Sequence, residues 1–131
     1  MTKSFGIAAM IIVVAISSAS SQTITNVEES FKKATEEIRP TLPKKVDQIT
    51  TWTGVSHSGT SLKYDFKLDL KSAELPPNAL SLIRQNTVKQ VCQTSTVVNA
   101  MKAGGVYIYK YQTADAKSLG QFEVRSKDCA Q

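Results

Sequence analysis

The clearest pattern in the chain is a strict alternation of apolar and charged side chains between Leu62 and Lys71. Leucine, tyrosine and phenylalanine occupy the even positions, and lysine and aspartate occupy the odd ones. Because successive side chains of a strand point to opposite faces, this pattern predicts a half-buried antiparallel strand. The threonine-rich stretch 46–55 is predicted to be its partner strand, with a bulge near Gly54 and the turn at 56–60.

A second hairpin is predicted in the last third of the chain. Residues 105–111 are β-branched and aromatic, and residues 120–125 place Phe122 and Val124 on one face, with Glu123 and Arg125 on the other. Residues 113–118 connect these two predicted strands. We therefore expect two hairpins separated by the middle of the chain.

Apolar residues at spacings of three and four predict helices before and between the hairpins. The first helix has Ile24, Val27, Phe31, Ala34 and Ile38 on one face. Thr25 and Asn26 are competing caps for it, and Pro40 ends it. A second helical region opens at Pro77, and a shorter helix covers 94–103 and ends at Gly104. The pattern leaves open whether these last two helices join into one bent helix.

This order of elements, α-β-β-α-α-β-β, predicts an α+β fold. The economical arrangement is a four-stranded antiparallel sheet, built from the two hairpins, with the helices packed on one face. A chain of 131 residues provides for one such domain.

The first 21 residues have the three parts of a secretory signal peptide. Lys3 supplies the positive charge, 5–16 form an apolar run, and small residues follow. A twelve-residue apolar run spans about 18 Å as a helix, which is short of a membrane core of about 30 Å. We therefore expect cleavage of 1–21 and a mature domain of 22–131, the alternative being an uncleaved anchor. Since no cysteine lies near the cleavage region, a lipoprotein signal is not expected, and the predicted location is periplasmic or secreted.

Cys92 and Cys129 are the only cysteines in the chain. In an oxidising compartment, a disulfide between them is the default expectation. A redox pair usually has two intervening residues and lies at a helix N-terminus, whereas these cysteines are 37 positions apart. The predicted bridge is therefore a structural one.

Charge and composition argue against several functional classes. The chain has sixteen basic and eleven acidic residues, and the two kinds are interspersed without a basic cluster. No nucleic-acid partner is therefore expected. No zinc-ligand spacing, phosphate-binding loop or nucleophile elbow is present, and we expect no catalytic, metal or cofactor site. The single histidine, His57, lies between two serines and is predicted to be an exposed turn residue.

Tyr107, Tyr109 and Tyr111 repeat at every second position and so share one face of a predicted strand. If this face meets the helices, the three tyrosines belong to the core. If Val106 and Ile108 face the core instead, the tyrosines form an exposed stripe suited to binding a partner protein. Trp52 is predicted to be a core residue.

The chain also resembles a family of small exported bacterial proteins, mostly of unknown function. The positions that carry this resemblance are Leu42-Pro43, Val46-Asp47, Thr50, Leu62, Tyr64, Phe66, Val91-Cys92, Gly105 to Tyr111, Phe122, Val124 and Asp128-Cys129. The arrangement is also similar to the α+β pilotins of type II secretion, which carry a secretin subunit to the outer membrane. These resemblances imply a fold and a protein-binding role.

The sequence therefore favours an exported, non-enzymatic interaction module of the bacterial envelope, such as an accessory or chaperone of secretion assembly. Its partner would be another protein, and no membrane anchor would persist after signal cleavage. The second hypothesis is an inhibitor of an exported hydrolase that inserts the loop 55–60 or 113–118. The third hypothesis is a small secreted enzyme.

Overall fold

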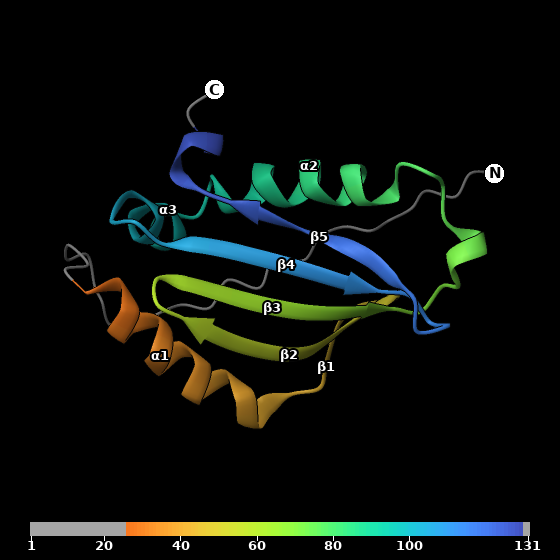
Figure 1. Ribbon diagram of the computed structural model, residues 1–131, viewed down its shortest axis with the longest axis horizontal. Coiled ribbons are helices and arrows are strands. Elements are labelled where there is room, and N and C mark those ends of the chain that lie inside the picture. Colours follow the sequence, from red (N-terminus) through yellow and green to blue (C-terminus); the bar gives the residue numbers. More distant parts are fainter. Residues whose placement is uncertain (1–25, 130–131) are drawn as a thin grey trace.

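The computed structural model describes residues 26–129, and the predicted signal peptide lies outside them (Figure 1). Helices α1, α2 and α3 and five strands, β1 to β5, form an α+β fold, joined by the short 3₁₀ helices η2, η3 and η4. The helices are Val27–Ile38, Ala79–Val91 and Ser95–Lys102; the strands are Lys44–Asp47, Thr50–Ser58, Ser61–Leu68, Val106–Gln112 and Ser118–Val124; and the 3₁₀ helices are Arg39–Thr41, Ser72–Glu74 and Ser126–Cys129.

The sheet has five strands in the order β1-β2-β3-β4-β5, not the predicted four. The additional strand, β1, begins at Lys44 and overlaps the start of the stretch 46–55 that was predicted as one partner strand. The chain turns at Gln48 and Ile49, where the Ile49 amide donates to Oδ1 of Asp47 at 2.9 Å. Because this turn divides the stretch into β1 and β2, the alternation of apolar side chains there is less regular than in β3.

The sheet is mixed, which corrects the prediction of a wholly antiparallel sheet. Strands β3 and β4 pair in parallel, with Tyr64 opposite Tyr109, whereas all other neighbouring strands are antiparallel. Helices α2 and α3 lie between β3 and β4 in the sequence. They return the chain to the end of the sheet at which β3 begins, so that β4 starts there as well. Such a helical crossover makes neighbouring strands parallel.

Helix α1 follows the predicted pattern closely from Val27 onward, while Ile24 and Thr25 lie outside the described residues. Asn26, one of the two candidate caps, accepts a hydrogen bond from the Glu29 amide at 2.9 Å. The α-helix ends at Ile38, because Pro40 lies in the following 3₁₀ turn. Its buried residues are Val27, Phe31, Ala34, Thr35 and Ile38.

Helices α2 and α3 are separate elements, joined by residues 92–94. Gly104 follows α3 with a φ of +107°, a left-handed conformation that glycine adopts without strain. Within residues 26–129, neither these helices nor α1 has the length and apolar character required to cross a membrane.

The core lies on one face of the sheet. The even-numbered side chains of β3 and the odd-numbered side chains of β4 are buried beneath the helices. Charged and polar side chains, together with Val106 and Ile108, occupy the opposite, open face. Helix α1 packs on β2 and β3, and α2 packs on β5 (Figure 1). The predicted layering, with the helices on one face, therefore agrees with the structure.

Candidate interaction surfaces

The three tyrosines of β4 lie on the helix-covered face. Tyr107, Tyr109 and Tyr111 are 3%, 6% and 6% exposed, so the first of the two predicted orientations is the one found. Val106 and Ile108 lie on the open face and are half-buried. The exposed tyrosine stripe is thus absent from the described sheet.

Aromatic rings form a continuous layer across β2 to β5. The rings of Phe66 and Tyr111 stack with centroids 4.9 Å apart, and those of Tyr109 and Phe122 stack at 5.4 Å. Trp52, 2% exposed, meets Tyr64 edge to face at 5.0 Å and is a core residue, as predicted. Offset and edge-to-face aromatic pairs add to the stabilisation that burial provides.

Burial changes the acidity of the tyrosines in this layer. It raises the pKa of Tyr64 and Tyr109 well above the ordinary value, and the neighbouring tyrosines raise it further. Burial also raises the pKa of Tyr107 and Tyr111, although a hydrogen bond with Thr87 partly opposes the effect at Tyr111. All four hydroxyls are therefore neutral at physiological pH.

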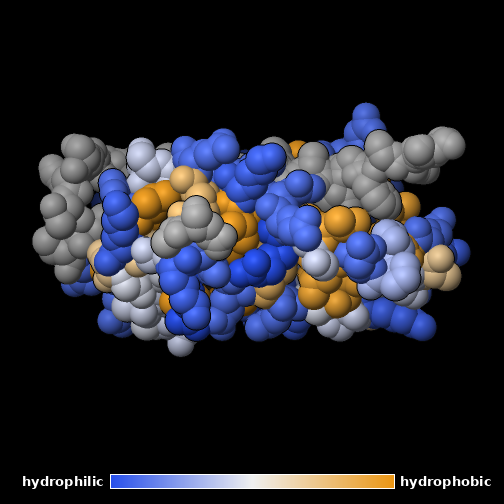
Figure 2. All heavy atoms as spheres, turned by 90° about the horizontal axis from the view of Figure 1, so that it is seen from above, coloured by the Kyte–Doolittle hydropathy of each residue, from blue (hydrophilic) through white to orange (hydrophobic). Residues whose placement is uncertain are grey.

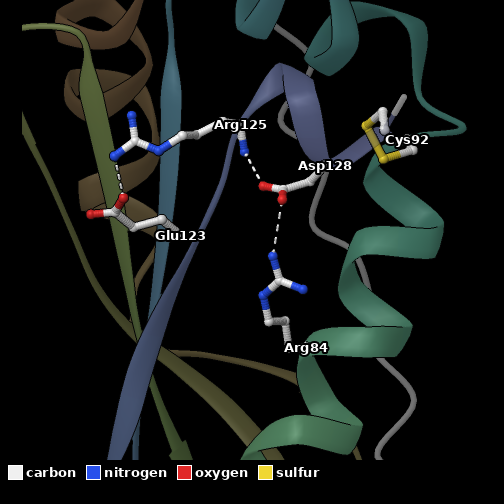
Figure 3. A network of polar contacts seen from close by, with 6 residues as sticks. Arg84, Cys92, Glu123, Arg125 and Asp128 are labelled. Atoms are coloured by element: carbon white, nitrogen blue, oxygen red, sulfur yellow. Dashed lines mark hydrogen bonds and ion pairs between the residues drawn. A yellow bond between two sulfur atoms is a disulfide. The ribbon is translucent and has the colours of Figure 1, made fainter. Parts of the chain in front are cut away.

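The two cysteines form the predicted disulfide. Cys92 follows α2 and Cys129 ends η4, and their Cα atoms are 5.4 Å apart (Figure 3). Beside the bridge, Asp128 accepts a hydrogen bond from the Arg125 amide at 2.8 Å and forms an ion pair with the Arg84 guanidinium at 3.2 Å. Arg125 in turn pairs with Glu123. The disulfide and the Arg84–Asp128 ion pair attach the C-terminal 3₁₀ helix to α2.

His57 lies in β2 and not in the predicted turn. It is paired with Leu62, so its side chain lies on the helix-covered face and is half-buried. Its Nδ1 atom is buried and has no hydrogen-bond partner in the described part of the chain. The strand extends further than predicted because Gly59 and Thr60 alone make the turn, with Gly59 at a φ of +58°.

The two loops considered for an inhibitor have little free length. Residues 55–58 belong to β2. The 113–117 loop is closed by a hydrogen bond from the Thr113 amide to the Lys117 carbonyl at 2.9 Å, and Asp115 attaches it to Ser72 by two bonds of 3.0 Å. Thr113 and Ser72 hold the pKa of Asp115 down, at about 2.

Two features of the surface were not found from the sequence. A polar hollow on the open face lies beside Asp65, which the alternation marked only as a charged position of the strand, and beside Lys110. Leu82 of α2 is an exposed large hydrophobic side chain, at 37%. Viewed from the α2 side, apolar surface occurs in separate areas between hydrophilic side chains (Figure 2). No group of three or more potential metal ligands occurs within residues 26–129.

These features define a disulfide-bridged α+β scaffold with one helix-covered and one open sheet face. No protein-family model matches the chain, and no curated protein matches it by sequence. Solved structures do match. The pilotin EpsS of the type 2 secretion system of Vibrio vulnificus has a TM-score of 0.69 and 16% sequence identity, over 79% of this chain and 91% of that one.

Two further structures share the fold. A Pseudomonas aeruginosa protein thought to be secreted has a TM-score of 0.69 at 13% identity, over 79% of this chain and 92% of that one. The type II secretion pilotin AspS of Vibrio cholerae has a TM-score of 0.63 at 13% identity, again over 79% and 92%. The resemblance to pilotin-like exported proteins is therefore confirmed at the level of the fold. The disulfide itself is typical of proteins that fold in an oxidising compartment.

Proposed function

We propose that this chain is an exported, non-enzymatic interaction module that assists the assembly of a secretion apparatus in the bacterial envelope. The observation that carries the proposal is the fold shared with two type II secretion pilotins over 79% of the chain. We further propose that residues 1–21 are cleaved as a signal peptide and that the partner is a secretin subunit.

The helix-covered side supports this role better than the open side does. Helix α2 carries Leu82, the large hydrophobic side chain that is exposed within residues 26–129, on a turn next to the buried Ile83. Burial of such an exposed apolar side chain against an apolar partner removes apolar surface from water and so favours association. A secretin segment with an apolar face would make such a contact.

The disulfide keeps this surface in place. The bridge joins Cys92, which directly follows α2, to Cys129 of η4. Helix α2 is therefore attached to the segment that follows β5 in the chain. A helix held in this way loses little conformational freedom when a partner binds, which lowers the cost of association.

Co-expression with the type II secretin of the same organism tests the proposal. The full chain should co-purify with the secretin from solubilised envelopes, and its deletion should reduce the fraction of secretin assembled in the outer membrane. A Leu82→Glu variant should lose capture, because it places a carboxylate in the apolar contact. Gln85→Glu is the matched control, since it adds the same charge at an exposed position of the same helix.

Normal secretin assembly without the chain, together with no co-purification, would exclude the proposed role. If Leu82→Glu retains capture at the level of Gln85→Glu, the partner binds elsewhere than at this face of α2. Circular dichroism of both variants establishes that they are folded.

A further inference from the structure

A polar hollow of about 370 Å³ lies on the open face of the sheet, away from the helices and from Leu82. Its wall is formed by strands β2 to β5 and by the loop between β4 and β5. The lining includes Thr53, Gly54, Asp65, Lys110 and Gln112, together with Phe66 and Tyr111. Phe66 and Tyr111 have their side chains in the core, so they contribute backbone to this hollow.

Gly54 makes room for the hollow. The pairing of β2 with β3 shifts between Trp52 and Gly54, and this bulge places Gly54 opposite Asp65. A Cβ atom at residue 54 would lie 3.0 Å from Oδ2 of Asp65, so the carboxylate rests over the glycine. Gly54 does not have a positive φ, so glycine is required here for the space that a side chain would occupy and not for its backbone conformation. Glycine inside a strand weakens it and often marks a site of close approach.

Two opposite charges face this space from neighbouring strands. Asp65 of β3 and Lys110 of β4 are partners in the parallel register, on strands that run about 4.8 Å apart. Neither side chain forms an ion pair within residues 26–129. The Thr53 hydroxyl donates to the backbone carbonyl of Asp65 at 3.1 Å, and this bond holds the Thr53 side chain at the rim of the hollow. Gln112 adds an exposed amide beside Lys110.

We infer that this hollow binds the zwitterionic group of an amino acid. The ligand ammonium would lie at the Asp65 carboxylate, and the ligand carboxylate would lie at the Lys110 ammonium, with the Gln112 amide able to donate to it. A simple anion is disfavoured because it would meet Asp65. A sugar is disfavoured because no aromatic ring faces the hollow. The volume of the hollow is near the lower limit for small-molecule sites, which favours a small ligand.

The zwitterionic group has two sources. It can belong to a free amino acid, or it can be the free end of a diamino acid within a peptide. A titration followed by amide chemical shifts distinguishes them, with glycine and free L-lysine as one arm and a peptide containing diaminopimelic acid as the other. The titration uses the chain as purified after export, with its disulfide formed. We expect saturable shifts at Gly54, Asp65 and Lys110, with a dissociation constant of about 1 mM for the better arm.

Three variants test the assignment of the charges. Asp65→Asn and Lys110→Met should each weaken binding by about tenfold, because each removes one of the two charge contacts. Gly54→Ala should also weaken it, since the new methyl group displaces the carboxylate. Lys63→Met, which removes an open-face lysine that does not line the hollow, is the matched control and should bind normally.

Methylamine and acetate provide the corresponding controls on the ligand, and each alone should bind more weakly than glycine. The inference is overturned if no zwitterion shifts these amides at about 20 mM, about twentyfold above the expected constant. It is also overturned if Asp65→Asn binds as well as the unaltered chain. Because the hollow and α2 lie on opposite sides of the sheet, either result is independent of secretin capture.

Discussion

Arg84 of α2 and Asp128 of η4 form an ion pair of 3.2 Å on the same side of the molecule as the Cys92–Cys129 disulfide (Figure 3). Arg84 lies on α2, eight residues before Cys92, the residue that directly follows the helix, which corresponds to about 12 Å along the helix axis. The C-terminal 3₁₀ helix is thus attached at two points. The two attachments differ in kind, because one is covalent and the other joins side chains that are 40% and 19% exposed.

Removal of the disulfide should lower stability far more than removal of the ion pair. Replacing both cysteines by serine should reduce the free energy of unfolding by about 4 kcal/mol, because a closed loop of 37 residues restricts the unfolded chain. Arg84→Gln should cost less than about 1 kcal/mol, since solvent screens a partly exposed pair. Urea denaturation measures both values. Equal losses in the two variants would contradict this ranking.

The tyrosines should not titrate individually in the folded protein. All four tyrosines of the chain are buried, and burial raises the pKa of each above the ordinary value of 10.0. The stabilisation from keeping them neutral is therefore complete below pH 10.0 and is lost as the pH rises further.

Ultraviolet absorbance of tyrosinate and circular dichroism, recorded together against pH, test this expectation. Tyrosinate should form in one cooperative step that coincides with unfolding. Tyrosinate formation near pH 10 while the circular dichroism stays native would show that at least one hydroxyl is accessible.

The sequence was sufficient for the parts of the fold that rest on regular local patterns. Strand β3 alternates without interruption, and the hydrophobic face of α1 matches its buried residues. Asn26 was one of two equivalent caps, and the Asn26–Glu29 contact identifies it as the one used. Such elements are predictable because neighbours in sequence determine them.

The sheet order was not predictable in the same way. The Asp47–Ile49 turn that separates β1 from β2 depends on one side-chain hydrogen bond inside a strand-like stretch. The parallel pairing of β3 with β4 is set by the path of α2 and α3, which local pattern does not record. For the same reason the alternation placed Asp65 on a charged face without showing that it is the register partner of Lys110 beside a hollow.

Asp115 should make the stability of the protein sensitive to acid. Its carboxylate accepts hydrogen bonds from Thr113 and Ser72, and these hold its pKa at about 2, below the ordinary 3.8. The stabilisation from these bonds is present above pH 3.8 and is lost as the pH falls toward 2.

Asp115→Asn should therefore be less stable than the unaltered chain at neutral pH, and the difference should shrink at acid pH. Thermal unfolding between about pH 2 and pH 7 measures the difference. The exposed Glu74 to Gln change is unsuitable as a control, because Glu74 accepts from the Lys71 amide. Glu37→Gln on α1 is the better control and should show no such convergence.

Gly105 should be among the least replaceable positions in the chain because of crowding. A Cβ atom there would lie 2.9 Å from both the Ala100 carbonyl and the Phe31 ring, and 3.2 Å from Val27. Gly105 does not have a positive φ, so the obstacle is space and not backbone conformation. Gly105→Ala should cost about 1 to 3 kcal/mol, because the backbone carbonyl cannot rotate away and the core is closely packed. Phe31→Leu in the same chain should offset part of this loss, and a double-mutant cycle by urea denaturation measures the coupling. Additive costs in that cycle would show that the Phe31 ring does not oppose the new methyl group.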